Sequence, residues 1–485
     1  MFLSGTYLET IHQLDNLVKD CMDIQSIDAS PLLLENKFLN SNKGKMYFIT
    51  ETTGVITLKE IILGFTDVEP IDSFENIEGV LMSGNAVLVL ETSEEQTVGQ
   101  RQCRALKVKA NGYPGLSIGE AKDEQVLRGS SEGFSESYKT NEVLIRKRIR
   151  SYELKIWETN VGVRSKTGLA LVYMDSIVRK EVLQDIQKRL EQFQIDGVTD
   201  SGMIEQLTDN EVWSPFPKYM TTTRPDRAAQ FLLNGQIIVL LDNSPVALVL
   251  PVNAWTFLKT ADDYYEKYAV ATFNRILRMI AVFFSVSLPA LYVAIVNFHP
   301  EILPSSLVNV FIKGRQEIPY PVFIEVMLME ISFELIREAG VRVPGTMGNA
   351  MGLVGGLIVG QAVVEANLAS PIIVVITAIT AMCSFAVPNI EFASALRLVK
   401  YFLIIMSEIF GIFGYLTGIL LIFINLSKID SFGFPYLGPL AAEELNEEEV
   451  KKDFIFRAPF KYLTKRTTFG NPENRQKLRF GEDKK

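Results

Sequence analysis

The chain has few of the side chains that most metal sites and hydrolases use. Among its 485 residues are two histidines, His12 and His299, and three cysteines, Cys21, Cys103 and Cys383. No two cysteines are close in sequence and the histidines are far apart. The sequence therefore indicates no zinc site, no CxxC redox motif and no histidine-based catalytic triad. We expect no bound metal, no cofactor and no enzymatic activity.

An excess of positive charge and a phosphate-binding loop are also missing. The chain has 48 Lys and Arg against 57 Asp and Glu, a net charge of −9, which argues against a general nucleic-acid binder. Gly129 and Gly133 lie in a Gly- and Ser-rich break, RGSSEGFSE, away from any strand–helix pattern, so no nucleotide site is predicted. The first twenty residues lack the pattern of a signal peptide, and we expect none.

Apolar residues are distributed unevenly along the chain. The mean hydropathy is +0.17, which is high for a soluble protein. Residues 1–275 are patterned like a soluble α/β region, residues 276–426 are mostly apolar, and residues 427–485 are charged again. The sequence therefore predicts an α/β N-terminal region, with two subdomains on the cytoplasmic side, followed by an α-helical multi-span membrane domain.

The α/β region divides at the Gly- and Ser-rich break. We predict an N-terminal helix over residues 1–30, a first α/β subdomain over 31–127, a linker over 128–140 and a second α/β subdomain over 141–265. Short β-rich runs mark the expected strands, which are Lys45–Thr50, Ala86–Glu91, Ala105–Ala110, Leu169–Tyr173, Ile237–Leu241 and Ala247–Leu250. Asp262–Asp263, close to the end of this region, is interpreted as a surface turn.

A basic run follows the predicted linker. NEVLIRKRIR carries four cations, Arg146, Lys147, Arg148 and Arg150. Such a run is either a solvated helix face or a contact with another subunit or with lipid phosphates.

Four long apolar stretches predict membrane spans at residues 276–296, 346–364, 369–388 and 401–426. A fifth stretch, residues 319–337, is apolar but contains acidic residues. Glu330 and Glu334 are four residues apart and share one helix face. This helix either lies in the membrane interface or lines an aqueous path whose acidic residues attract cations.

The stretch at 346–364 has two distinct faces. Small residues at i, i+4 spacing favour close helix packing; they are Gly348, Gly352, Gly356 and Gly360. Ile358, Gln361 and Glu365 lie on the opposite side and are candidates for lining a path, because polar groups at this depth need water or a polar neighbour. Val359 and Val363 flank the glycines and form a candidate constriction if the glycines face inward.

Positive charges give the expected topology. Lys267 and Arg275 before the first span, and Arg278 near its start, place the N-terminal region in the cytoplasm. The eleven Lys and Arg of residues 451–485 place the tail there too. Five simple crossings would leave the tail outside, so either one element is re-entrant or the last stretch folds back near Gly411–Gly414.

Several long motifs resemble the A subunits of spore germinant receptors, the GerA family. The motifs are SEGFSESYKTNEVLIRKRIR (131–150), SPFPKYMTTTRPDRAAQFLLNGQIIVLLDNSPVALVLP (214–251), LPALYVAIVNFHPEILP (288–304), EVMLMEISFELIREAGVRVP (325–344), LVGGLIVGQAVVEANLASPIIVV (353–375) and SFGFPYLGPL (431–440). Thr223 departs from the family pattern, which usually has an acidic residue before Arg-Pro. Arg224 and Asp226 beside it are either a helix N-terminus or a subunit contact.

The resemblance implies a multi-pass protein of the inner membrane of bacterial endospores. It implies a complex with a transporter-like B subunit and a lipoprotein C subunit. It also implies a homo-oligomer, a pentamer, around a gated path that releases monovalent cations when a nutrient binds. Two alternatives stay open, namely a sporulation-locus paralogue that forms a channel without sensing nutrients, and a secondary transporter. The sequence does not name the nutrient.

Overall fold

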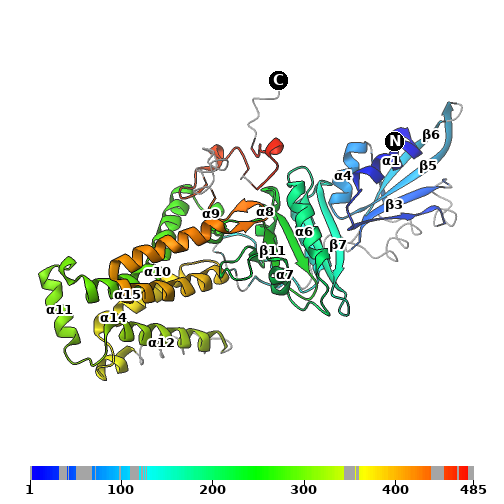
Figure 1. Ribbon diagram of the computed structural model, residues 1–485. Helices are drawn as coiled ribbons and strands as arrows, with labels where there is room; N and C mark the ends of the chain where they lie inside the picture. Colours follow the sequence, from blue (N-terminus) through cyan, green and yellow to red (C-terminus); the bar gives the residue numbers. More distant parts are fainter. Residues whose placement is uncertain are drawn as a thin grey trace.

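The computed structural model describes residues 3–31, 41, 43–50, 68–71, 73–97, 100–109, 119–121, 124, 126, 128–342, 356, 360–438, 453–466 and 469–478. Three parts follow one another along an elongated molecule (Figure 1). A sheet with two helices lies at one end, a second α/β unit lies in the middle, and a layer of long helices extends from the other side.

The first part is an antiparallel sheet in the order β1-β6-β5-β3-β2, with β4 also paired to β6. Its elements are β1 Leu3–Thr6, α1 Tyr7–Leu17, β2 Ile24–Asp28, β3 Gly44–Ile49, β4 Val68–Ile71, α4 Phe74–Met82, β5 Ala86–Thr97 and β6 Gln100–Val108. The predicted single helix over 1–30 is wrong. Thr6 and Glu9 form a capping box that begins the helix at Tyr7, and the flanking segments pair as strands instead.

The second part has a five-stranded antiparallel sheet in the order β7-β8-β10-β11-β9. Its elements are α5 Tyr138–Arg148, β7 Leu154–Val161, β8 Thr167–Met174, α6 Lys180–Gln192, α7 Ser201–Thr208, β9 Met220–Thr222, α8 Pro225–Leu233, β10 Ile237–Leu241 and β11 Ala247–Leu250. Every residue of β8 is buried. Ala170 and Val172 pack with α5 and α8, whereas Leu169 and Leu171 pack with α6. Helices cover both faces, so the central strands are continuously apolar.

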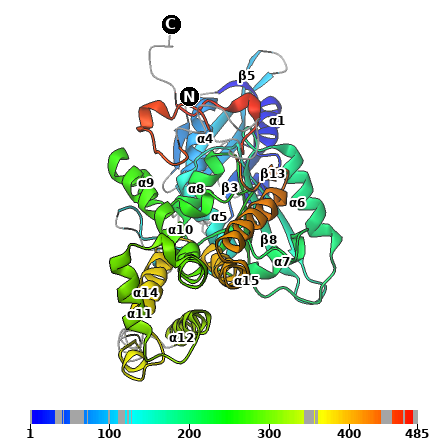
Figure 2. The same cartoon turned by 60° about the vertical axis from the view of Figure 1, so that its left-hand side comes forward.

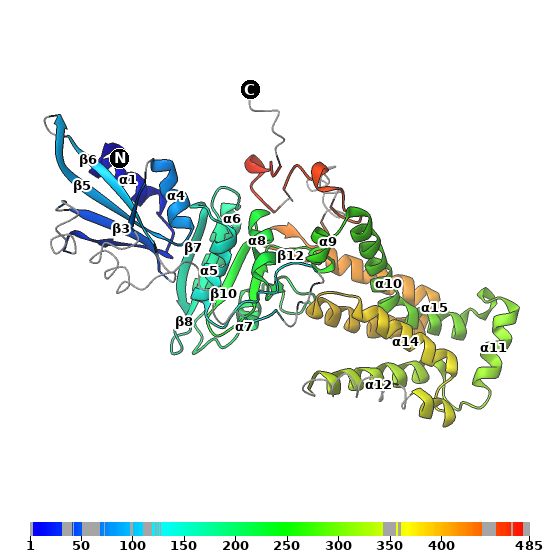
Figure 3. The same ribbon diagram turned by 180° about the vertical axis from the view of Figure 1, so that it is seen from behind.

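The third part is helical. Its longer helices run beside one another, namely α10 Tyr268–Phe298, α12 Val322–Arg342, α14 Pro371–Phe385 and α15 Ile390–Lys428, and the shorter α11 Ser305–Arg315 lies across their far end (Figure 1). Figure 2 shows several of these helices nearly end-on, and Figure 3 shows α14 beside α12. In the described part of the chain, α10 and α15 are long and apolar enough to cross a membrane, and α14 is apolar but has 15 residues.

Helix α15 reverses direction at Gly411. The backbone of Gly411 has φ 60° and ψ −138°, which is not helical. A Cβ atom on Gly418 would lie 2.7 Å from Leu403 Cδ2, whereas residues fifteen apart in a straight helix are separated by about 22 Å. The structure therefore contains the predicted fold-back near Gly411–Gly414. The predicted stretch 401–426 is not one span, because it belongs to two antiparallel arms, residues 390–410 and 412–428.

The second arm returns the chain to the α/β part. After Lys428, a small ladder joins β12 Asp430–Ser431 to β13 Phe434–Pro435. The Ser431 hydroxyl donates to the Lys218 carbonyl, 3.2 Å away, and accepts from the Val252 N–H at 3.1 Å. Further on, the Asn471 N–H donates to the Ile177 carbonyl at 2.6 Å. The tail therefore lies on the same side of the helices as the two sheets.

Candidate functional site

The acidic stripe of α12 faces basic residues of α15. Lys400 donates to Glu330, and Arg397 donates to Glu334. The side chains of Glu330 and Lys400 are 3% and 6% exposed. In the single chain Glu330 therefore does not face water, whereas the Glu334 side chain is 35% exposed. In the single chain the two carboxylates are matched by cations from the first arm of α15, as charges in an apolar layer require.

A further carboxylate of α12 fixes the distant end of the helices. Glu325 is buried, and its carboxylate accepts from Arg315 Nη2 at 2.9 Å and from the Ser370 N–H at 3.2 Å. Ser370 is the N-cap of α14. At the other end of α12, Arg337 Nη2 donates to Ser384 Oγ at 2.8 Å. The two contacts align α12 with α14 along its length.

The end of the glycine-containing stretch presents polar groups to the exterior. Residues 360–365 are helical, and Gln361 and Glu365 are exposed, one helical turn apart. Val363 between them is buried in the core, so in the single chain it does not face a path. Ile358 and Val359 lie outside the described residues. Of the pore-lining candidates that the structure describes, Gln361 and Glu365 are the ones left open to a neighbour or to water.

Two of the four ladder glycines can be placed. A Cβ on Gly356 would meet nothing within 4 Å, and one on Gly360 would lie 3.6 Å from Val374 Cγ1 of α14. Gly348 and Gly352 lie outside the described residues. A close helix contact at Gly356 would therefore have to come from another chain or from a segment that the structure does not describe.

The basic run of α5 holds the two sheets together. Arg146 is fully buried, and its guanidinium donates to both carboxylate oxygens of Asp23, at 2.9 and 2.8 Å. Lys147 and Arg148 both pair with Glu132. The prediction of a subunit contact is wrong for Arg146, because a buried bidentate pair leaves it no surface. Arg150 is exposed and stays a candidate.

Arg224 and Asp226 belong to a helix N-terminus. Arg224 is the N-cap of α8 and Pro225 is its first residue. The buried Arg224 guanidinium donates to Asp226 at 2.8 Å and to the Ser130 carbonyl at 2.8 Å. Burial opposes ionisation of Asp226, but hydrogen bonds from Arg224 and Tyr265 outweigh it and lower the pKa of the carboxyl. The predicted linker is thus packed against α8, and the subunit-contact role of Arg224 is corrected.

A buried ionic network joins the tail to the start of α10. Asp263 pairs with Arg275 and Arg278 at 3.1 and 3.2 Å, and Asp453 pairs with Arg275 at 2.7 Å. Lys259 Nζ lies 3.1 Å from Asp453. Burial opposes ionisation of Asp453, yet these cations lower its pKa to about 2. The interpretation of Asp262–Asp263 as a surface turn was wrong for Asp263, which is buried.

Comparison with known proteins identifies the family to which this chain belongs. Residues 10–469 match the model of the Bacillus/Clostridium GerA spore germination protein family. The chain belongs to the GerA family. It is 36% identical over 437 residues to spore germination protein KA of Bacillus subtilis (strain 168), which covers 90% of this chain and 78% of the relative. It is 33% identical over 398 residues to spore germination protein A1 of the same organism, covering 81% and 80%.

Two further similarities widen the comparison. An uncharacterized membrane protein of the same organism, YfkQ, is 36% identical over 413 residues, covering 85% of this chain and 78% of the relative. The crystal structure of the N-terminal domain of the A subunit of the Bacillus megaterium spore germinant receptor GerK3 aligns with a TM-score of 0.36 and 21% identity, over 51% of this chain and 96% of that chain. The sequence matches make this chain a member of the A-subunit family of spore germination receptors.

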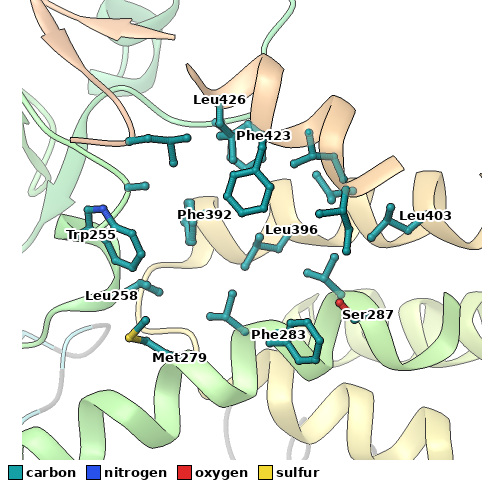
Figure 4. Close-up of a pocket in the computed structure, with 18 residues that line it drawn as sticks. Trp255, Leu258, Met279, Phe283, Ser287, Phe392, Leu396, Leu403, Phe423 and Leu426 are labelled. Atoms are coloured by element: carbon teal, nitrogen blue, oxygen red, sulfur yellow. The ribbon is translucent and has the colours of Figure 1, made fainter. Parts of the chain in front are cut away.

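An apolar cavity lies where the helices of this GerA protein meet the second sheet (Figure 4). Its volume is about 440 Å³. Trp255 and Leu258 border it from the α/β side, and α10 and both arms of α15 supply most of the remaining wall. Sequence analysis missed this cavity, because its walls come from segments more than a hundred residues apart.

The network around Asp263 and Asp453 was also missed, although a signal was present. Arg275 and Arg278 stand one turn apart at the start of the predicted apolar span. Their position marks the topology, but guanidinium groups that enter an apolar layer also need anionic partners. Asp263 is twelve residues before Arg275, whereas Asp453 is 178 residues after it. Only the nearer partner was open to inference from spacing.

Proposed function

We propose that this protein is the A subunit of a nutrient-responsive spore germinant receptor. Five copies surround a gated path for monovalent cations in the inner spore membrane. A transporter-like B subunit and a lipoprotein C subunit complete the receptor. The sheets lie on the cytoplasmic side, and the helices from α10 to α15 cross the bilayer.

The observation that carries this proposal is the exposure of Gln361 and Glu365. Both are exposed on the helical residues 360–365, whose other members are apolar or glycine. Polar groups in hydrocarbon require water or a polar neighbour. The acidic residues of α12 are not available as this polar neighbour, since Glu330 and Glu334 are already paired with Lys400 and Arg397. Rotational symmetry would bring Gln361 and Glu365 from several copies around one aqueous path.

The packing of the helices supports assembly from several copies. Large apolar side chains remain exposed on α10, α14 and both arms of α15, among them Phe283, Val375, Leu398 and Phe413. Lipid or a neighbouring subunit covers such faces. A ring of Glu365 carboxylates would concentrate cations and repel anions.

The test is recording from the purified protein in planar bilayers. Glu365→Gln keeps the size of the side chain and removes its charge, and we expect a clear loss of cation-over-anion selectivity. Glu301→Gln is the matched control, because Glu301 is exposed near the same end of the helices, before α11, and outside the 360–365 helix. Unchanged selectivity in Glu365→Gln, or a purified complex without any conductance, would contradict the proposal.

A further inference from the structure

We propose that the apolar cavity between α10 and the two arms of α15 binds an acyl chain of a membrane phospholipid. Each helix presents a continuous apolar stripe to it. On α10 the stripe runs from Met279 to Ser287, about 12 Å of helix. The two arms of α15 contribute residues at three- and four-residue spacing, which are Phe392, Leu396, Val399, Leu403, Ile419, Ile422, Phe423 and Leu426. Ser287 is the single hydroxyl in the lining.

The cavity is continuous with the outer apolar surface of the helices. Phe283 and Phe423 line it on opposite sides, yet each is 52% exposed. Beside Phe283, Ile280 on α10 is exposed, and beside Phe423, Leu420 on α15 is exposed. In a bilayer these faces contact hydrocarbon, so an acyl chain enters from the lipid without crossing water. This inference rests on the membrane location given under the proposed function.

Polar groups lie at the α/β end of the cavity. The indole of Trp255 lines this end (Figure 4). Its Nε1 is buried in the surrounding protein, so the ring and not the N–H faces the cavity. Lys428 is exposed two residues beyond Leu426, where the second arm of α15 ends. An indole ring near an exposed lysine is typical of the level at which phospholipid headgroups lie. The lipid therefore has its headgroup toward the sheets.

The nearest other occupant is a segment of this chain. Leu437 lines the cavity, and residues 439–452, PLAAEELNEEEVKK, follow directly. That segment contains five glutamates and two lysines in fourteen residues. Lys428 can pair with one of these carboxylates, and the apolar lining residues would leave the others without a partner. The chemistry of the lining therefore favours an uncharged acyl chain over this segment.

Site-specific photo-cross-linking in the full chain distinguishes the occupants. Benzoylphenylalanine replaces Phe423, an aromatic residue that lines the cavity, in protein reconstituted in phosphatidylglycerol vesicles. The matched control replaces Phe413, which is 76% exposed on the same arm. When the protein is irradiated after transfer into lipid-free detergent, we expect phospholipid attached to position 423 and none attached to position 413. Attachment to residues 439–452 or to a second copy would overturn the proposal.

A substitution that fills the cavity gives an independent measurement. Leu396→Trp is expected to lower the phospholipid retained after detergent exchange about tenfold, because displacing roughly two methylenes from an apolar site costs about that factor. Leu398→Trp is expected to leave retention unchanged. Equal retention in the two variants, at equal thermal stability, would overturn the proposal. If Leu396→Trp does not fold, Val286→Phe fills the same cavity from α10.

Lipid retention is measured independently of ion current, so the two proposals can fail separately. A protein that retains phospholipid in this cavity but conducts no ions refutes the proposed channel and leaves the lipid site standing. A conducting protein that retains none refutes the lipid site alone.

Discussion

Glu330 of α12 and Lys400 of α15 form an ion pair in which both side chains are almost fully buried, although they are seventy residues apart in the chain. Lys400 is ten residues into α15, which places the pair about 15 Å along the first arm. Since both side chains are removed from water, each charge requires the other. The acidic stripe of α12 thus connects this helix to the hairpin of α15.

Removing one member of this pair should destabilise the protein. Glu330→Gln leaves the Lys400 ammonium buried without its counter-charge, and breaking such a pair costs about 3–5 kcal/mol. We expect a lower midpoint of thermal unfolding in detergent and a lower yield of purified protein. Adding Lys400→Met to Glu330→Gln should restore most of the lost stability, since the double variant has no unpaired buried charge. A double variant no more stable than Glu330→Gln would contradict this account.

The network at Asp453 predicts a defined dependence on pH. Its pKa of about 2 is lower than the value of about 3.9 for an unfolded aspartate. The folded chain therefore binds this proton more weakly, so the stabilisation is complete above about pH 4 and is lost as the pH falls toward 2.

Asp453→Asn should remove that stabilisation at pH 7 and leave Arg275 and Lys259 with less negative charge around them. The difference in unfolding midpoint between this variant and the unaltered protein should shrink as the pH is lowered from about 5 toward 3. Glu473→Gln, at an exposed position of the same tail, serves as the control and should show no difference. A difference independent of pH would assign the effect of Asp453→Asn to packing instead.

Gly411 should not tolerate a side chain. Its positive φ is unfavourable for other residues, and a Cβ there would lie 2.9 Å from Phe298 Cγ. We expect Gly411→Ala to lower the free energy of unfolding by about 1–3 kcal/mol, measured as a lower unfolding midpoint. Gly314→Ala in α11 is the control, because its nearest contact would be an ordinary 3.8 Å. Equal midpoints for the two variants would show that the reversal of α15 does not depend on glycine.

A substitution at Gly356 should distinguish the stability of a single chain from the assembly of several chains. Because a Cβ there would meet nothing within 4 Å, Gly356→Leu should leave thermal stability of the monomer nearly unchanged. If the glycines pack against another copy, the same variant should shift the complex toward monomer on native gels. Gly360→Leu should instead lower monomer stability, since Val374 of α14 is already 3.6 Å from the added Cβ. An unchanged oligomer in Gly356→Leu would refute packing between copies at this glycine.

Local patterns in the sequence predicted many of the elements. Ile237–Leu241 and Ala247–Leu250 are strands with the predicted bounds, because a short β-branched run between turn residues has few other stable conformations. The start of α8 at Pro225 followed from proline at the first helical position. The predicted N-terminal helix is too long because the spacing of Leu8, Ile11, Leu14 and Leu17 does not indicate where the flanking segments pair with β6 and β3.

The sequence by itself determined the succession of α/β and apolar parts and the family, since these depend on composition and on contiguous motifs. The tertiary structure alone decided the partners of the charged residues. Arg146 reads as part of a basic surface run, yet Asp23, 123 residues away, holds it in the interior. Likewise, Glu330 reads as a candidate pore residue until Lys400 lies against it. A charged residue in an apolar stretch of the sequence indicates that a partner is needed. The identity of that partner depends on which distant segments the fold brings within a few ångströms.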